Sequence, residues 1–229
     1  MKRAIYLSVL AVITVGCILW RVGADTFGWL EKDEGNEEVS GRTETLDAFG
    51  KISVEADTLD ITIEKGKEYS LTYHAAGKDA PEYSLEDGVL TVTQKQKKHW
   101  HIGIVQSQPA AMIITVPEGA VLKDVDITSD VGDVDVREII AENFECILDV
   151  GDLTAENAEF TECTIDADVG DVDVSLIGEI KDYNVSLETG VGEARLNGEK
   201  VKTSRINAPD AEGFLDISAD VGDIDVTIN

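Results

Sequence analysis

Basic residues are scarce in this chain of 229 residues. Lysine and arginine number 19 against 46 aspartate and glutamate residues, which gives a formal net charge of -27. A chain of this charge repels a phosphate backbone, and no basic stripe offsets the repulsion. The composition therefore excludes nucleic acid as a partner.

The residue patterns of common enzyme sites are also missing. The serines lack a nucleophile-elbow motif, no phosphate-binding loop occurs, and no paired carboxylates stand in an apolar setting that would raise a pKa. Of the three histidines, His99 and His101 flank Trp100, but no cysteine or acid stands nearby at zinc spacing. This segment favours a polar loop in which Trp100 belongs to a partner-binding patch. The sequence predicts no enzyme and no cofactor.

Cysteine occurs three times, at Cys17, Cys146 and Cys163. Cys146 and Cys163 stand where neighbouring repeats have isoleucine, leucine, valine or phenylalanine, which predicts core packing. A disulfide between them is the alternative, but they are two slots out of register and the bond would be strained.

A seven-residue motif, Asp-Val-Gly-Asp-Val-Asp-Val at Asp130–Val136, is the feature that the second half repeats. Variants begin at Asp149, Asp168, Gly190 and Asp220. Their central glycines are 19, 19, 22 and 30 residues apart, the period range of stacked-repeat proteins. These glycines are Gly132, Gly151, Gly170, Gly192 and Gly222.

Apolar residues alternate with polar ones on both sides of each glycine, which is the period of a half-buried strand. At the Gly-Asp pair the alternation of apolar and polar residues shifts by one position. This pair should therefore turn a corner, where glycine tolerates a positive φ. A period near 19 has little room for a crossover helix, whereas it suffices to wrap once around a narrow coil. The repeats therefore predict an all-β β-solenoid, in which each coil covers the apolar face of the one before.

The N-terminus carries a hydrophobic segment. Lys2 and Arg3 precede 17 uncharged residues, Ala4–Trp20, which favours one short membrane helix with its N-terminus in the cytoplasm. Cleavage after Val22-Gly23-Ala24, or a lipoprotein site at Cys17, are the alternatives. We therefore expect residues 1–24 to be an anchor or signal at a bacterial cell membrane, and the acidic residues 25–45 to be a flexible stalk outside the cytoplasm.

Residues 46–119 are expected to form strands joined by short turns. Glu86-Asp87-Gly88 separates two alternating stretches, a strong hairpin signal. This part should cap the first coil of the repeats, which occupy residues 120–229.

Several of these segments resemble a known bacterial family. They are the strands at Ile52–Ile63, the segment Lys97–Ile104, the strand and turn at Ile114–Gly119, and the repeated Gly-Asp-Val-x-Val strands. Together they are similar to the putative-adhesin family of unknown function, related to the toast-rack domains of envelope-stress proteins. The resemblance covers about Ala48–Asn229. It implies a single-stranded right-handed β-helix on the cell envelope, in some relatives with a role in sensing envelope stress, and it implies no catalytic residues.

The acidic corner is the one candidate metal site. If the coils stack in register, like carboxylates lie about 4.8 Å apart and each pair repels by about 1 kcal/mol at the dielectric of water. Carboxylates are the ligands that Ca²⁺ prefers, which gives a calcium hypothesis; a solvated acidic face with turn-capping aspartates is the alternative. The residues that the calcium hypothesis names are Asp130, Asp133, Asp149, Asp152, Asp168, Asp171, Asp220 and Asp223.

Two functions follow. The first is an anchored binding or sensing module whose flat strands contact a protein, a peptide or a cell-wall ligand. The second is a structural or adhesive element. Because the sequence ends at Asn229, directly after the last strand, we expect an uncovered final coil that pairs edge to edge with another copy.

Overall fold

The computed structural model describes residues 40–75, 80–95, 110–201, 204–206, 208 and 210–229. The chain divides into two compact units, Met1–Asn36 and Glu37–Asn229, and every described residue belongs to the second. The predicted anchor, most of the predicted stalk and the segment around Trp100 lie outside the described residues. None of the described helices is long and apolar enough to span a membrane.

The described residues form strands and one short 3-10 helix, η2 (Ile180–Asp182). The strands before the repeats are β1 (Ser40–Thr45), β2 (Lys51–Ala56), β3 (Asp60–Gly66), β4 (Ser70–Ala75), β5 (Glu82–Glu86), β6 (Val89–Gln94) and β7 (Ala111–Pro117). Those of the repeats are β8 (Val121–Val131), β9 (Val134–Arg137), β10 (Ile140–Val150), β11 (Leu153–Val169), β12 (Val172–Leu176), β13 (Tyr183–Val191), β14 (Ala194–Leu196), β15 (Glu199–Val201), β16 (Ser204–Ile206), β17 (Gly213–Val221) and β18 (Ile224–Ile228).

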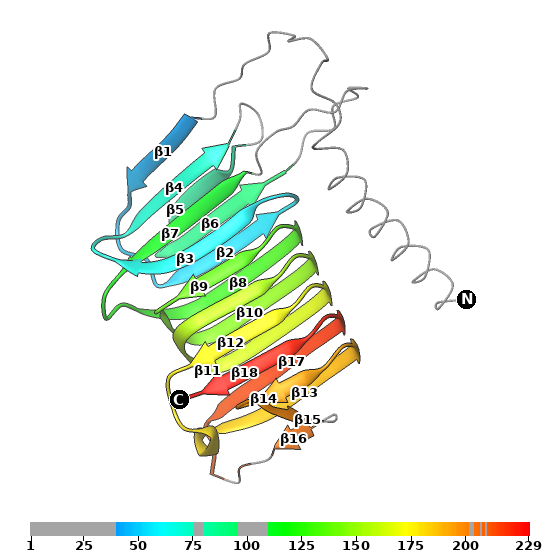
Figure 1. Cartoon of the computed structure of the whole chain (residues 1–229). Helices are drawn as coiled ribbons and strands as arrows, with labels where there is room; N and C mark the ends of the chain where they lie inside the picture. Colours follow the sequence, from blue (N-terminus) through cyan, green and yellow to red (C-terminus); the bar gives the residue numbers. More distant parts are fainter. Residues whose placement is uncertain (1–39, 76–79, 96–109, 202–203, 207, 209) are drawn as a thin grey trace, which may run out of the picture. The chain divides into compact units, whose positions relative to one another are not determined.

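Each repeat contributes one strand to each of two sheets and turns between them at the Gly-Asp pair. One sheet, here sheet B, has the order β5-β6-β2-β8-β10-β11-β17-β13-β16. The other, sheet A, has the order β1-β4-β7-β3-β9-β11-β12-β18-β14-β15. The long strand β11 serves both sheets. Coils of nearly equal length therefore stack in parallel, as Figure 1 shows, and the predicted all-β class is confirmed.

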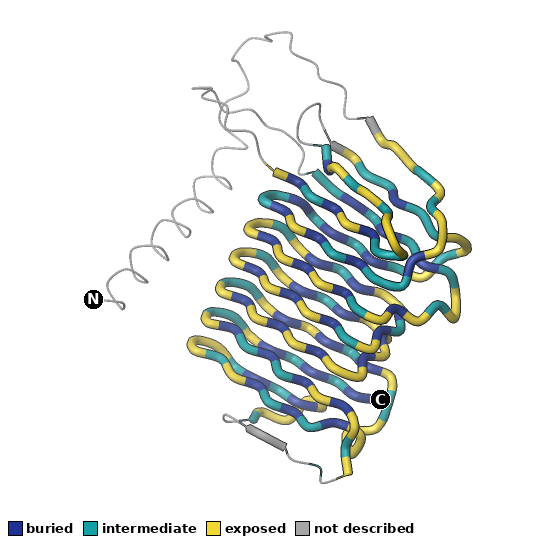
Figure 2. Tube along the Cα trace, turned by 180° about the vertical axis from the view of Figure 1, so that it is seen from behind, coloured by how far each residue is buried: buried dark blue, intermediate teal, exposed yellow. Residues whose placement is uncertain are grey.

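The coils stack in the register that the glycine alignment predicts. Ile127 pairs with Cys146, and Cys146 pairs with Ile165. All three side chains are buried between the two sheets, with 1% exposure or less. Figure 2 shows the resulting alternation of buried and exposed positions along each coil. The hydrophobic effect on these inward rows is the main force that holds one coil on the next.

The order of the coils in space differs from their order in the sequence. The last coil, β17 and β18, lies between β11–β12 and β13–β14, and pairs with both in parallel. The prediction of an uncovered final coil is therefore wrong. The first coil, β2 and β3, is inserted in the same way between β6–β7 and β8–β9. The red strands of Figure 1 show the insertion at the C-terminal end.

Short antiparallel strands cover both ends of the stack. At one end β5 pairs with β6, β4 with β7, and β1 with β4; at the other β16 pairs with β13, and β15 with β14. Ser40–Thr45, expected in the stalk, is thus a strand, because β4 offers a free edge that satisfies its backbone groups. The predicted hairpin at Asp87-Gly88 is confirmed, with φ of 51° and 75°. Both sheets continue through the predicted division between residues 119 and 120.

Candidate functional site at the glycine-aspartate corner

The repeated glycines form a column at the corner between the two sheets. Their φ is 143° at Gly132 and 154° to 157° at the other four, a region that disfavours L side chains. A Cβ on Gly132 would lie 2.2 Å from the carbonyl oxygen of Leu59. At the other four glycines it would lie 1.8 to 2.0 Å from the carbonyl oxygen of the next glycine in the column. Glycine is therefore required by the approach of the neighbouring coil as well as by the turn.

The aspartate after each glycine builds a hydrogen-bond ladder up the column. The backbone N–H of Asp152 donates to Asp133 Oδ1 over 3.0 Å, and that of Asp171 donates to Asp152 Oδ1 over 2.8 Å. The same contact joins Asp133 to Asp60 over 3.2 Å and Asp223 to Asp171 over 2.8 Å. One carboxylate oxygen of each accepting aspartate thus takes a hydrogen bond from a backbone N–H of the adjacent coil. The sequence predicted turn capping here, and the structure places the cap between coils.

The aspartates two residues before each glycine form a second, outer row. Asp130, Asp149, Asp168 and Asp220 are all exposed. Partial burial, followed by repulsion from Asp149 and Asp220, raises the pKa of Asp168 above its ordinary value of 3.8. This row therefore carries the like-charge repulsion that the register predicts.

The valine between the two aspartate rows is exposed in three repeats and half-buried in two, at Val169 and Val221, although strand alternation places it among the inward positions. Val131 is 46% exposed, Val150 40% and Val191 68%. The reason is the corner itself, which turns the chain outward one residue before the glycine. An apolar ridge thus runs between two acidic rows.

The structure brings the predicted calcium ligands together as two rows. Among the described residues, no three histidine, cysteine, aspartate or glutamate side chains gather closely enough to hold a metal ion. Asp133, Asp152, Asp171 and Asp223 already accept backbone hydrogen bonds. Calcium binding stays a prediction.

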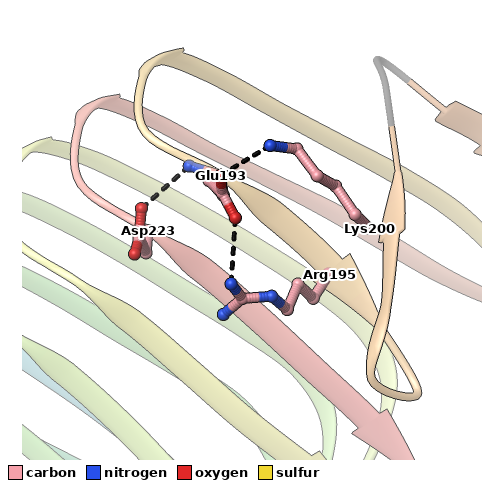
Figure 3. A network of polar contacts seen from close by, with 4 residues as sticks. All are labelled: Glu193, Arg195, Lys200 and Asp223. Carbon is pink, nitrogen blue, oxygen red and sulfur yellow. Dashed lines mark hydrogen bonds and ion pairs between the residues drawn. The ribbon is translucent and has the colours of Figure 1, made fainter.

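The ladder ends at Glu193, where a glutamate replaces the aspartate. Its N–H donates to Asp223 Oδ1 over 2.8 Å, and no further coil follows to use its carboxylate. Instead the carboxylate pairs with Lys200 Nζ at 2.6 Å and with an Arg195 guanidinium nitrogen at 2.9 Å (Figure 3). Lys200, with a lesser contribution from Arg195, lowers the pKa of Glu193 below its ordinary value of 4.5. The longer side chain reaches the β14–β15 hairpin and closes the end of the stack.

One copy of the repeat escaped the sequence analysis. Asp57-Thr-Leu-Asp-Ile-Thr-Ile63 stacks on Asp130–Val136 in register, with Leu59 where the other corners have glycine. The signal was present in the two aspartates and the alternating isoleucines, but the missing glycine hid it. Leu59 is buried, and in the coil beyond it β6 ends at Gln94 and β7 begins only at Ala111, so the connection is longer than a Gly-Asp pair.

A groove on the opposite edge was also missed. We call it the return groove, because it lies where each strand of sheet A returns to sheet B. It has a volume of about 600 Å³. Its lining residues are Lys65, Val116, Pro117, Glu118, Gly119, Ala120, Glu138, Ile139, Ile140, Asn157, Glu159 and Ile177. No sequence signal marks it, because its residues come from turns whose spacing only the stack defines.

The remaining predicted positions are simpler. Cys146 and Cys163 are buried and free, so core packing is confirmed. Burial raises the pKa of both thiols, which makes them poor nucleophiles. His74 is exposed on β4, and His99, Trp100 and His101 lie outside the described residues.

Comparison with solved structures supports the fold. The chain is similar to a putative cell adhesion protein from Clostridium sporogenes, with a TM-score of 0.65 and 15% identity. That match covers 84% of this chain and 100% of the other. A putative adhesin from Bacteroides fragilis matches at a TM-score of 0.40 and 12% identity, over 83% of this chain and 98% of the other.

Sequence comparison gives the family. Among curated proteins, no sequence matches this chain. The family model Toastrack DUF4097 matches residues 49–229, which is nearly the whole of the described unit. This range includes the first coil with Leu59, the glycine column and the inserted last coil. The chain therefore belongs to the Toastrack DUF4097 family.

Proposed function

We propose that the chain is a non-enzymatic binding module, held outside the cytoplasm at a bacterial cell membrane by its N-terminal segment. The observation that carries this proposal is the constant register of the coils. It arranges outward side chains in straight rows, such as Asp126, Glu145, Thr164, Asp216 and Ser186 on sheet B. Rows of this kind present a flat, stiff surface.

A flat surface suits a large ligand better than a small molecule, which needs a concave pocket. The outward rows of sheet B are rich in acids, and therefore favour a protein, peptide or cell-wall ligand that presents basic or neutral groups. Among the described residues, no cluster of histidine, cysteine, aspartate and glutamate side chains could hold a catalytic metal ion. This supports binding in preference to catalysis.

Sensing and adhesion are the two forms that such binding takes. The similarity to a protein named as a cell adhesion protein favours adhesion, whereas the family resemblance to envelope-stress domains favours sensing. The covered ends of the stack argue against adhesion through an open C-terminal edge, because β15 and β16 occupy the edges there.

Binding to intact cells and isolated cell walls tests the proposal. The fragment Glu37–Asn229 contains every described strand and the whole buried core. We expect it, when labelled, to bind saturably, and to lose binding as salt rises. The variant Asp126→Asn/Glu145→Gln/Asp216→Asn should bind more weakly. Binding no stronger than that of serum albumin, another acidic protein, would contradict the proposal.

Location needs its own measurement. Protease added to intact cells should degrade the chain, and the membrane fraction should retain its N-terminal segment in mass spectrometry. Protection from the protease until the cells are opened would contradict a position outside the cytoplasm.

A further inference from the structure

We propose that the return groove of one copy binds the basic segment Lys95–Val105 of a second copy. The inference rests on the proposed binding function and names one partner and one surface for it. Four observations support it: the apolar floor of the groove, its acidic rim, the composition of the segment, and the distance between the two.

The floor of the groove is apolar and partly open to solvent. Ile177 is 50% exposed, and beside it Val121, in an adjoining depression that shares Ile140 and Ile177, is 55% exposed. Val116 and Ile139 are buried beneath them, with 2% exposure each. Exposed aliphatic side chains over a concave surface mark an interaction site in a chain that is otherwise strongly charged.

The rim of the groove is acidic. Glu118, Glu142 and Glu159 are exposed along it. Lys65 is the one basic residue among the lining residues, all of which the structure describes, and it already pairs with Glu138. The groove therefore attracts a segment that combines positive charge with apolar side chains.

One segment of this chain has that composition. Lys95–Val105 reads Lys-Gln-Lys-Lys-His-Trp-His-Ile-Gly-Ile-Val and contains no acid. Lys95 pairs with Glu55 at 3.5 Å, as other basic residues pair with acids of their own unit, so Lys97 and Lys98 are the lysines that we assign to the groove. A tryptophan beside lysines is the kind of residue that anchors interfaces.

The position of the segment favours a second copy. Its flanks are fixed at the glycine-aspartate corner, because the N–H of Asp57 donates to Gln94 O and that of Asp60 to Ala110 O, both over 2.9 Å. The groove lies at the other end of the strands, beyond Pro117, the last residue of β7. The seven residues of β7 span about 23 Å. To enter the groove of its own copy, the segment would have to extend along the full length of β7. The segment of a second copy can approach the groove from outside and does not have to span this distance.

Segment and groove are different surfaces, so the contact is head to tail. Such contacts close into a ring where the rotation between copies allows it, and otherwise build an open chain in which each end keeps a free groove or a free segment. This gives the family fold a route to adhesion that does not use the covered sheet edges.

Sedimentation of the full-length chain in detergent micelles tests the inference. We expect the mean mass to rise with protein concentration and to fall as salt is raised from 50 to 500 mM. Ile177→Glu and Trp100→Ala should each weaken self-association at least tenfold. Val191→Glu is the matched control, because Val191 is 68% exposed at the corner edge, away from the groove; it should leave association unchanged.

A charge swap decides which copy supplies the segment. We expect that neither Lys97→Glu/Lys98→Glu nor Glu118→Lys/Glu159→Lys associates alone, and that an equal mixture does, because each segment then meets a groove of opposite charge. A mixture that stays monomeric, or a wild-type chain that is monomeric at all concentrations, would overturn the inference. Binding of the Ile177→Glu variant to cells is measured in parallel. If it matches wild type while self-association proves absent, only this inference fails and the proposed function stands.

Discussion

The first corner of the stack holds leucine where the five that follow hold glycine, although all six turn the chain from sheet B to sheet A. Leu59 is buried, with 1% exposure, and the coil stacked beyond it joins β6 to β7 through a connection longer than a Gly-Asp pair. Each glycine instead lies against the carbonyl oxygen of the next coil. The difference teaches that the turn alone does not require glycine. Glycine is required because the carbonyl oxygen of the adjacent coil approaches the position of its missing Cβ.

The largest effect is expected at the centre of the column. Gly170→Ala places a Cβ 1.8 Å from Gly151 O at a φ of 155°, so we expect a loss of about 4 kcal/mol or failure to fold. Gly88→Ala is the control, since Gly88 also has a positive φ, of 75°, but no atom within 4 Å of the added Cβ. It should cost about 1 kcal/mol. Equal losses in urea unfolding would show that φ, and not the neighbouring coil, decides.

Leu59 should behave as a core residue. Leu59→Ala removes a buried side chain, for which we expect a loss of about 3 kcal/mol. Leu59→Gly should be no more stable than Leu59→Ala in the same unfolding experiment. A glycine variant more stable than the alanine variant would mean that this corner, too, prefers glycine for its backbone.

A smaller effect is expected in the aspartate ladder. Asp171→Ala leaves the N–H of Asp223 without its carboxylate acceptor, which should cost about 1 kcal/mol. Asp171→Asn retains an acceptor oxygen and removes one negative charge, so it should leave the free energy of unfolding nearly unchanged. Equal losses for the two variants would contradict a ladder built on the acceptor oxygen.

Acid should affect the middle and the end of the stack in opposite directions. The pKa of Asp168 is raised, so its folded-state penalty is present at neutral pH and disappears as pH falls below the raised pKa. The pKa of Glu193 is lowered, so its contribution is present above pH 4.5 and is lost as pH falls through the lowered pKa. At pH 7, Asp168→Asn should raise Tm and Glu193→Gln should lower it slightly. The Asp168→Asn difference should vanish well below pH 3.8, and the Glu193→Gln difference should shrink as pH falls below 4.5. Differences that do not change with pH would contradict the linkage.

The smallest effect is expected from calcium. Because the ladder occupies one oxygen of each inner aspartate, we expect millimolar CaCl₂ to raise Tm only as much as MgCl₂ does at the same ionic strength. A specific calcium site would show as a larger rise with CaCl₂ than with MgCl₂, and would establish the calcium hypothesis. No shift at all with CaCl₂ would exclude it.

The sequence was a good guide to the five copies of the repeat that keep the glycine. Ile127, Cys146 and Ile165 lie in one inward row because the glycine spacing sets a single register and each coil obeys it. The acidic rows at Asp149 and Asp168 follow from the same register. The order of the coils could not be predicted, since copies with nearly the same pattern fit beside one another in any order.

The details that choose this order lie outside the repeated pattern. Glu193 contacts Lys200 because β15 pairs with the outer edge of β14, which requires the coil of β13 and β14 to be outermost. Tyr183 donates a hydrogen bond to Phe160 O over 3.0 Å, a contact between segments 23 residues apart. The return groove needs turns from several coils at once. These features depend on individual side-chain contacts, which the repeat period of the sequence does not specify.

The inserted last coil has a consequence for synthesis. Until Gly213–Ile228 has left the ribosome, β13 and β14 have only the short strands β16 and β15 beside them and lack the parallel partners that join them to the stack. The stack is therefore complete only when β17 and β18 insert between β11–β12 and β13–β14. A chain that lacks β17 and β18 should therefore be more sensitive to proteases, because β13 and β14 are then not joined to the rest of the stack.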